Sequence, residues 1–138
     1  MSRRVIVDAS AMVDLLVGTS LADAVADRLL GHELHAPAHF DAEVLSALGR
    51  LHRAGHITAR QAEARINRLA AAPVERHTLS TLVTGAWKLR HNLRLLDALY
   101  VELASQLDVP IITTDSGMAA ATTAAELLTK QPQPGSSP

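Results

Sequence analysis

Two short β-branched runs that each stop at an acidic residue constrain the fold of this 138-residue chain most. Residues 4–7 (RVIV) end at Asp8, and residues 109–114 (VPIITT) end at Asp115. Runs of this length and composition predict buried strands. Apolar residues at helical spacing occupy much of the sequence between them, which predicts an α/β fold built on a parallel sheet.

We expect a single domain over residues 1–130, with a central parallel sheet of four or five short strands flanked by helices. The expected strands are 4–7, 33–36, 74–78 and 109–114, and a weaker strand pattern indicates a fifth at 124–128. The expected helices are one capped near Ser10, one from Thr19 or Ser20 to residue 30, and further helices at 39–54, 58–72, 80–90 and 95–106. Residues 131–138 (QPQPGSSP) have the composition of a disordered tail.

Composition excludes several classes of protein. The chain has no cysteine, so it has no disulfide framework, thiolate zinc site or cysteine nucleophile. It has one Phe, one Trp and one Tyr, which argues against folds that stack bases on aromatic platforms. Neither a glycine-rich phosphate loop nor a serine-nucleophile elbow is present. No targeting segment or run of about 20 apolar residues is visible, so we expect a cytoplasmic protein without a membrane partner.

Four acidic residues stand out from the apolar pattern. Asp8 and Asp115 follow strands, and ligands of parallel sheets bind beyond the carboxyl ends of the strands. Glu43 and Asp97 lie within apolar helical stretches, where an unpaired carboxylate is costly. Only Asp97 has a basic residue within a turn, Arg94. Taken singly, each acid is more typical of a structural residue, such as a strand-end turn or a helix cap, than of a catalytic one, but the four together favour a common site.

Clustered carboxylates raise one another's pKa, and a divalent cation relieves that repulsion. Ligand sets of oxygen atoms alone suit Mg²⁺ or Mn²⁺. A cation held in this way is typical of phosphodiester hydrolysis, because it activates a bound water and offsets charge in the transition state. The sequence therefore indicates a metal-dependent hydrolase as one candidate function.

Four segments, taken in order, resemble the motifs of PIN domains. They are residues 5–11 (VIVDASA), 37–50 (PAHFDAEVLSALGR), 95–104 (LLDALYVELA) and 112–115 (ITTD). The resemblance runs from residue 5 to about residue 128, and a single domain of this length is similar to VapC-type toxins of type II toxin–antitoxin pairs.

The resemblance implies a Mg²⁺- or Mn²⁺-dependent endoribonuclease that cleaves structured RNA, such as tRNA or rRNA. It makes Asp8, Glu43, Asp97 and Asp115 the acidic quartet. It also implies a homodimer and a VapB-like antitoxin partner whose C-terminal segment blocks the acidic pocket.

Within the quartet, we expect Asp8, Asp97 and Asp115 to bind the metal, with Glu43 acting directly or through metal-bound water. Ser10 and Thr114 carry hydroxyls beside the acids. They are candidates to orient metal-bound waters, and helix capping or strand-end hydrogen bonding is the alternative.

Other functions remain open. A non-catalytic regulatory or binding module has the same α/β pattern. Phosphoaspartate phosphatases need a second Asp two residues after the first, where this chain has Ser10. His52 and His56 have an i, i+4 spacing, and His32 to His35 (HELH) falls one residue short of a metalloprotease motif. We expect these histidines to be surface or packing residues.

Charge is unevenly distributed along the chain. The net charge of −1 divides into −4 over residues 1–49, +7 over 50–94 and −4 over 95–138. A basic middle segment can steer a phosphate backbone, although a solvated helix face is an equally good interpretation. The candidate RNA contacts are Arg50, Arg53, Arg90 and Arg94.

Overall fold

The structure is a computed structural model that describes residues 3–130, so the expected tail at 131–138 lies outside the described residues. Five strands form one parallel sheet in the order β3-β2-β1-β4-β5. The strands are β1 (Arg4–Val7), β2 (Glu33–Pro37), β3 (Val74–His77), β4 (Ile111–Thr113) and β5 (Ala125–Leu127). The predicted α/β fold is confirmed, and the last strand, for which the sequence pattern was weak, does form.

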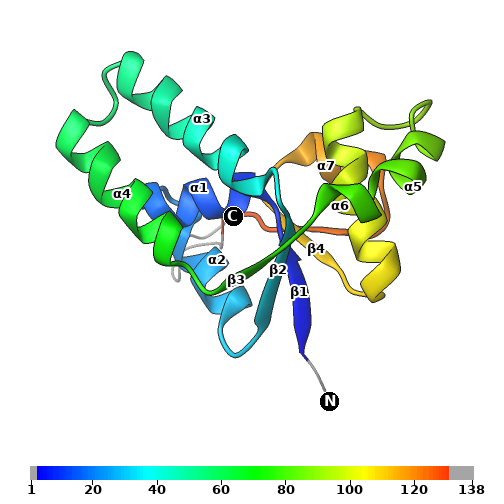
Figure 1. Cartoon of the computed structure of the whole chain (residues 1–138). Helices are drawn as coiled ribbons and strands as arrows, with labels where there is room; N and C mark the ends of the chain where they lie inside the picture. Colours follow the sequence, from blue (N-terminus) through cyan, green and yellow to red (C-terminus); the bar gives the residue numbers. More distant parts are fainter. Residues whose placement is uncertain (1–2, 131–138) are drawn as a thin grey trace.

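Seven α-helices connect the strands in the described part of the chain. They are α1 (Ala9–Val17), α2 (Ala22–Leu29), α3 (Phe40–Arg53), α4 (Ala59–Ala71), α5 (Val83–Lys88), α6 (Leu95–Leu107) and α7 (Ser116–Ala121). Figure 1 shows α1 to α4 gathered on one side of the sheet and α5 to α7 on the other. β1 lies at the centre, and its Ile6 and Val7 are completely buried. Helices on both faces therefore bury most of the central strands.

Several predicted boundaries were wrong. Ser10 does not cap α1, because the helix begins at Ala9 and Asp8 occupies the cap position. Thr19 does accept a backbone N–H, but from Leu21, which precedes α2. Ser20 does not cap that helix either.

The expected helix at 80–90 is interrupted, with a 3₁₀ turn at Leu79–Thr81 before α5. β4 begins at Ile111, after Pro110, which has no N–H to donate to a neighbouring strand. The sequence reasoning missed α7, whose N-terminus is capped by the Asp115 side chain.

No single helix in the described range is long and apolar enough to span a membrane. The bent pair of α1 and α2, with an angle of 117° between them, satisfies the same criteria of length and composition when taken together.

Arg76 on β3 ties three elements together. Its guanidinium binds Asp41 in the first turn of α3, with Nη2 2.9 Å from Oδ1, and lies over the Phe40 ring. Asp41 lies where the helix dipole favours a carboxylate, and Arg76 adds an ion pair to that effect. The same guanidinium donates to three backbone carbonyls, those of Leu69, Ala72 and Val74. Arg76 therefore fixes the end of α4 and the start of α3, the helix that carries Glu43.

We expect Arg76→Met to lower the free energy of unfolding by on the order of 3 kcal/mol, since it leaves three partly buried carbonyls and Asp41 without their donor. Denaturant unfolding followed by circular dichroism measures this loss. Arg60→Met, at an exposed position on α4, is the matched control and should change the value by less than about 0.5 kcal/mol. Equal losses in the two variants would contradict the assigned role.

Candidate active site

The carboxyl ends of β1 and β4 bring the two strand-end acids together. β1 and β4 are adjacent and parallel, so Asp8 and Asp115 emerge at the same edge of the sheet. α3 and α6 add Glu43 and Asp97. All four carboxylates line one cavity of about 370 Å³. The structure therefore gathers the complete set of acids that the sequence singled out.

Asp8 is the most enclosed of the four, with 6% of its surface exposed. Its Oδ2 accepts hydrogen bonds from the hydroxyls of Thr113, at 2.7 Å, and Ser10, at 2.8 Å. Burial raises the pKa of Asp8 even though both hydroxyls lower it, and the charge of Asp97 raises it further. The two hydrogen bonds thus fix the orientation of the carboxylate, but they do not fully compensate for the burial of its charge.

Glu43 is held by Tyr100, whose hydroxyl donates to Glu43 Oε1 at 2.7 Å. His39 Nε2 lies 3.4 Å from the same oxygen and 3.0 Å from the carbonyl oxygen of Leu96. Burial raises the pKa of Glu43, and Asp8 and Asp97 add to the rise. Burial and the neighbouring carboxylates also hold the pKa of Tyr100 far above its ordinary value, so the phenol stays protonated as a donor.

Asp97 and Asp115 complete the cavity. Burial raises the pKa of Asp97, and Asp115 raises it further, against the lowering effect of Arg94, whose Nε is 3.5 Å from Asp97 Oδ2. Asp115 is exposed, and its Oδ1 accepts the N–H of Gly117 at the start of α7. This hydrogen bond holds the carboxylate at the mouth of the cavity.

The donor set of the cavity suits a hard divalent cation. All four acids supply oxygen, and three have raised pKa values because they are buried among like charges. In the part of the chain that the structure describes, three ligand atoms come within 4.8 Å of one another only at His35, Glu75 and His77, which lie elsewhere. The carboxylates are thus spaced more widely than a tight cage, as suits an ion that keeps several of its waters.

The hydroxyls around the acids differ from the prediction. Ser10 donates directly to the Asp8 carboxylate, whereas Thr114 donates to Asp14, which also lines the cavity. Thr113 takes the place expected of Thr114, because Val7 pairs with Ile112 and the next residues along both strands are Asp8 and Thr113. Sequence reasoning missed Thr113 because the strand register was not available to it.

Tyr100 was also missed as a donor to the site. A signal was present, since Tyr100 is the only tyrosine and follows Asp97 by three residues, which places both on one face of α6. Asp14, which was not among the predicted site residues, also lines the acidic cavity.

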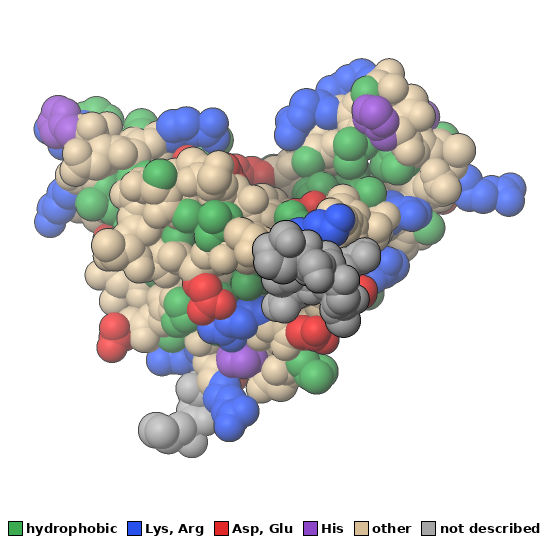
Figure 2. All heavy atoms as spheres, turned by 180° about the vertical axis from the view of Figure 1, so that it is seen from behind, with side chains coloured by type: hydrophobic (Ala, Val, Ile, Leu, Met, Phe, Trp, Pro, Cys, Tyr) green, Lys and Arg blue, Asp and Glu red, His purple; other side chains and the backbone are tan. Residues whose placement is uncertain are grey.

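Two of the four candidate arginines lie at the site. Arg50 and Arg94 line the acidic cavity and also a neighbouring one of about 620 Å³. Arg53 and Arg90 line neither, and the Arg90 guanidinium lies 4.7 Å from the centre of the Trp87 ring. Figure 2 shows a notch between two lobes, with acidic side chains on its floor and basic ones on both lobes. Acidic and basic side chains therefore lie close together on this face of the molecule.

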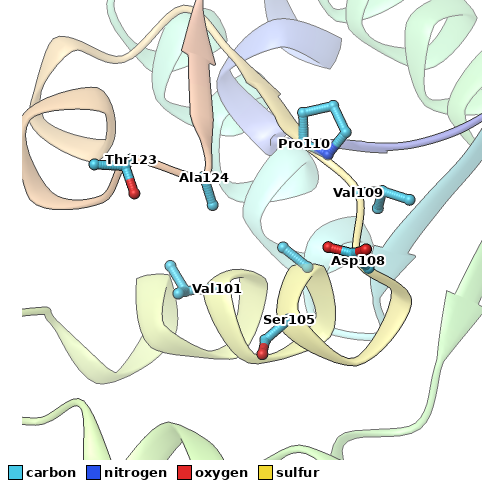
Figure 3. Close-up of a pocket in the computed structure, with 8 residues that line it drawn as sticks. Val101, Ser105, Asp108, Val109, Pro110, Thr123 and Ala124 are labelled. Carbon is cyan, nitrogen blue, oxygen red and sulfur yellow. The ribbon is translucent and has the colours of Figure 1, made fainter.

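A second hollow, of about 500 Å³, lies at the opposite end of the sheet (Figure 3). It is lined by Asp108, Val109 and Pro110, which precede β4, whereas Asp115 follows it. Asp108 is the one acidic residue of a lining otherwise made of small, mostly apolar residues. This hollow therefore offers a ligand far fewer charged groups than the acidic cavity does.

Comparisons with known proteins agree with this geometry. The family model described as PIN domain matches residues 5–124. Ribonuclease VapC3 of Mycobacterium tuberculosis is 56% identical over 119 residues, covering 86% of this chain and 87% of the relative. Ribonuclease VapC1 of the same species is 42% identical, covering 84% and 89%. A solved toxin–antitoxin complex from Klebsiella pneumoniae has the same fold, with a TM-score of 0.66 at 18% identity, covering 88% and 95%.

We expect Asp97→Asn to raise the unfolding midpoint of the chelator-treated protein at pH 7. A folded-state pKa above the ordinary value of 3.8 means that the charged carboxylate disfavours folding, so its stabilising protonated form is lost as pH rises. The gain should shrink as pH falls toward about 4, where wild-type Asp97 is increasingly protonated in both states. Thermal melts across this pH range measure it, with Asp108→Asn as the control, and an unchanged or lower midpoint at pH 7 would contradict it.

Proposed function

The chain belongs to the PIN domain family, and on this premise we propose that it is a metal-dependent endoribonuclease and the toxin of a toxin–antitoxin pair. The observation that carries the proposal is the single cavity in which Asp8, Glu43, Asp97 and Asp115 meet. The relatives named as VapC ribonucleases, similar over more than four fifths of the chain, support the reaction class.

We assign Mg²⁺ or Mn²⁺ as the cofactor, with Asp8, Asp97 and Asp115 as its ligands. When bound, such a cation supplies a more acidic water and offsets negative charge on the phosphate being cleaved. Ser10 and Thr113 hold the Asp8 carboxylate in place, because both of their hydroxyls donate to the same oxygen. That fixed orientation avoids reorganisation of the ligand during the reaction.

We assign Glu43, which lines the same cavity as the proposed metal ligands, as the residue that accepts a proton from the attacking water. Its raised pKa makes it a stronger base than an ordinary carboxylate. Tyr100 fixes Oε1 of Glu43, and the protonated phenol cannot itself take the proton. In this proposal the Glu43 carboxylate, and not the Tyr100 phenol, accepts the proton.

The proposed substrate is structured RNA, such as tRNA or rRNA, held mainly through its phosphate backbone. Arg50 and Arg94 flank the acidic cavity and can each pair with a phosphate. Arg53 and Arg90 are proposed to contact the RNA farther from the cleaved bond. The single exposed aromatic ring, Trp87, leaves little scope for stacking on bases.

The proposed protein partner is a VapB-like antitoxin, and the proposed assembly is a homodimer. Large apolar side chains are exposed on α3, α5 and α6, the helices that carry the two lobes of the notch; they are Leu45, Val83, Trp87, Leu95 and Leu96. Such side chains are typical of a surface that a partner covers. The Klebsiella pneumoniae complex supports a partner of this kind for the same fold.

We expect Asp8→Asn and Asp97→Asn each to reduce RNA cleavage roughly 100-fold or more, because each removes a charge that the cation requires. Mapping of cleaved RNA ends, with Mn²⁺ and with EDTA, measures this. Asp108→Asn is the matched control, since Asn tolerates the left-handed conformation that Asp108 adopts. Cleavage that persists in EDTA would contradict the metal mechanism, and RNA binding without any cleavage would favour a non-catalytic module.

We expect Thr113→Val to weaken Mn²⁺ binding about 10-fold, because it removes a hydroxyl donor to Asp8 while keeping the side-chain volume. Calorimetric titration of the metal into the full chain measures the change. Thr129→Val, at an exposed threonine without a side-chain hydrogen bond among residues 3–130, is the control. Equal affinities for the two variants would show that Thr113 does not position Asp8.

A further inference from the structure

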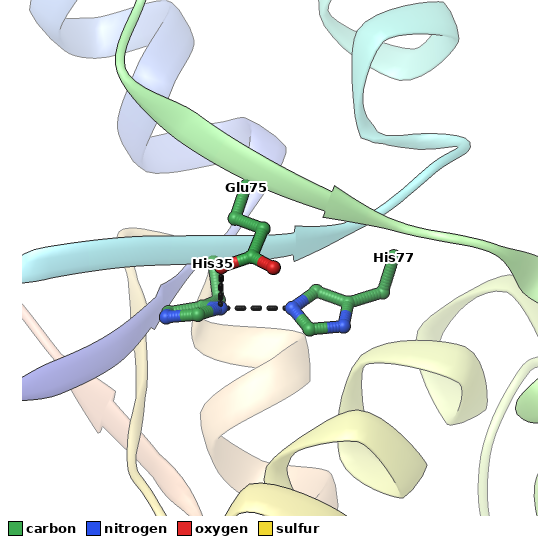
Figure 4. A group of neighbouring side chains, drawn as sticks. All are labelled: His35, Glu75 and His77. Carbon is green, nitrogen blue, oxygen red and sulfur yellow. Dashed lines mark hydrogen bonds and ion pairs between the residues drawn. The ribbon is translucent and has the colours of Figure 1, made fainter.

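A cluster of imidazole and carboxylate side chains lies on β2 and β3. His35 pairs with Glu75 in the parallel register, and His77 follows Glu75 by two residues. Residues two apart on a strand point to the same face of a sheet, so all three side chains share one face. Figure 4 shows them converging from the two neighbouring strands. None of the three lines the acidic cavity.

The potential ligand atoms are close together. His35 Nδ1 lies 2.8 Å from His77 Nε2 and 3.5 Å from Glu75 Oε2, and the three ligand atoms are all within 4.8 Å of one another. The His35 side chain is 3% exposed, whereas that of Glu75 is 63% exposed. The cluster thus has a rigid buried base and an accessible rim through which a small ion can enter.

Glu33 fixes the protonation of His35. The Glu33 carboxylate lies 2.7 Å from His35 Nε2, and a carboxylate only accepts, so Nε2 carries the proton. The lone pair of Nδ1 therefore points toward His77 and Glu75. A carboxylate behind a histidine, with the other ring nitrogen facing inward, is how metal-binding histidines are commonly oriented.

We propose that His35 Nδ1, His77 Nε2 and a Glu75 carboxylate oxygen form a zinc site, with water as a fourth ligand. Two imidazoles and one carboxylate are a known ligand set for zinc, and three protein ligands leave one position for water. Zinc–nitrogen bonds of about 2.0–2.1 Å in a tetrahedral site separate the ligand atoms by roughly 3.4 Å. The His35–Glu75 distance already matches, and the two rings must separate by about half an ångström.

Binding needs one rearrangement of protons. With the His35 proton on Nε2 facing Glu33, the hydrogen bond between the two rings requires His77 to donate from its Nε2 to His35 Nδ1. To bind zinc, the proton of His77 moves from Nε2 to Nδ1 through solvent, and both rings stay neutral. Glu33 and Glu75 place two carboxylates on this face, and one cation, Arg4, lies beside them as the register partner of Glu33 on β1. The acids outnumber the base, so the charge around the site favours a dication.

The site joins an edge strand to its neighbour. β3 is the last strand on its side of the sheet, and Arg76, between Glu75 and His77, anchors α3 and α4. Zinc at this position therefore stabilises the edge of the sheet. The nitrogen ligands separate this site in chemistry from the acidic cavity, which offers only oxygen and suits Mg²⁺ or Mn²⁺.

The test uses the untagged full chain, stripped with a chelator and then titrated with Zn²⁺ or Co²⁺. We expect one zinc per chain in a Asp8→Asn, Asp97→Asn double variant, which disables the acidic cavity. Co²⁺ should give the strong visible absorption of a four-coordinate site with nitrogen ligands. His77→Gln should abolish this binding, and Glu33→Gln should weaken it about 10-fold. His91→Gln, at an exposed histidine outside the cluster, is the control and should bind as the parent does.

Glu75→Gln keeps the test independent of folding, because the Glu75 side chain is mostly exposed and its loss leaves the core intact. This variant should retain its circular dichroism spectrum, bind zinc more weakly and gain less in thermal midpoint when zinc is added. The proposal is overturned if the parent binds no zinc, if His77→Gln binds it as well as His91→Gln does, or if only the acidic-cavity substitutions remove it.

Discussion

Negative charge concentrated at the carboxyl ends of two adjacent parallel strands is the constraint on which the site depends. Asp8 and Asp115 are brought to one edge because β1 pairs with β4, and α3 and α6 add two more carboxylates. The surrounding contacts limit the resulting repulsion. Hydroxyls hold Asp8, Tyr100 holds Glu43 and Arg94 faces Asp97. The raised pKa values show that these contacts only partly offset the effect of burial.

Stability and function therefore oppose each other in this cavity. A carboxylate whose pKa is raised by burial destabilises the folded chain at neutral pH, and the same charge attracts a divalent cation. Arginines from the basic segment 50–94 reduce the negative charge in the cavity. Arg94 partly neutralises Asp97, and Arg50 and Arg94 both add positive charge to the lining of the acidic cavity. The near-zero net charge conceals this separation.

Much of the fold and the acidic site could be predicted from local patterns. Strand composition predicted β1 and β4 together with the acids that follow them. The helix predicted over 58–72 does start at Thr58, whose side chain caps α4. Glu43 and Asp97 stood out because each interrupts an apolar helix face. Short-range signals failed where two interpretations competed. Ser10 is a residue type that commonly caps helices, but Asp8 occupies the cap position and α1 begins at Ala9. The single helix expected over 80–90 is divided into a 3₁₀ turn and α5.

The sequence by itself determined which side chains are chemically unusual, because burial of a charge is costly wherever it occurs along the chain. Only the tertiary structure decided which of them meet. Thr113 rather than Thr114 reaches Asp8, and His35 meets His77 from 42 residues away. Both outcomes depend on the register between strands, and a shift of one residue would turn every side chain to the other face. Register is set by the packing of the whole sheet, which no local pattern specifies.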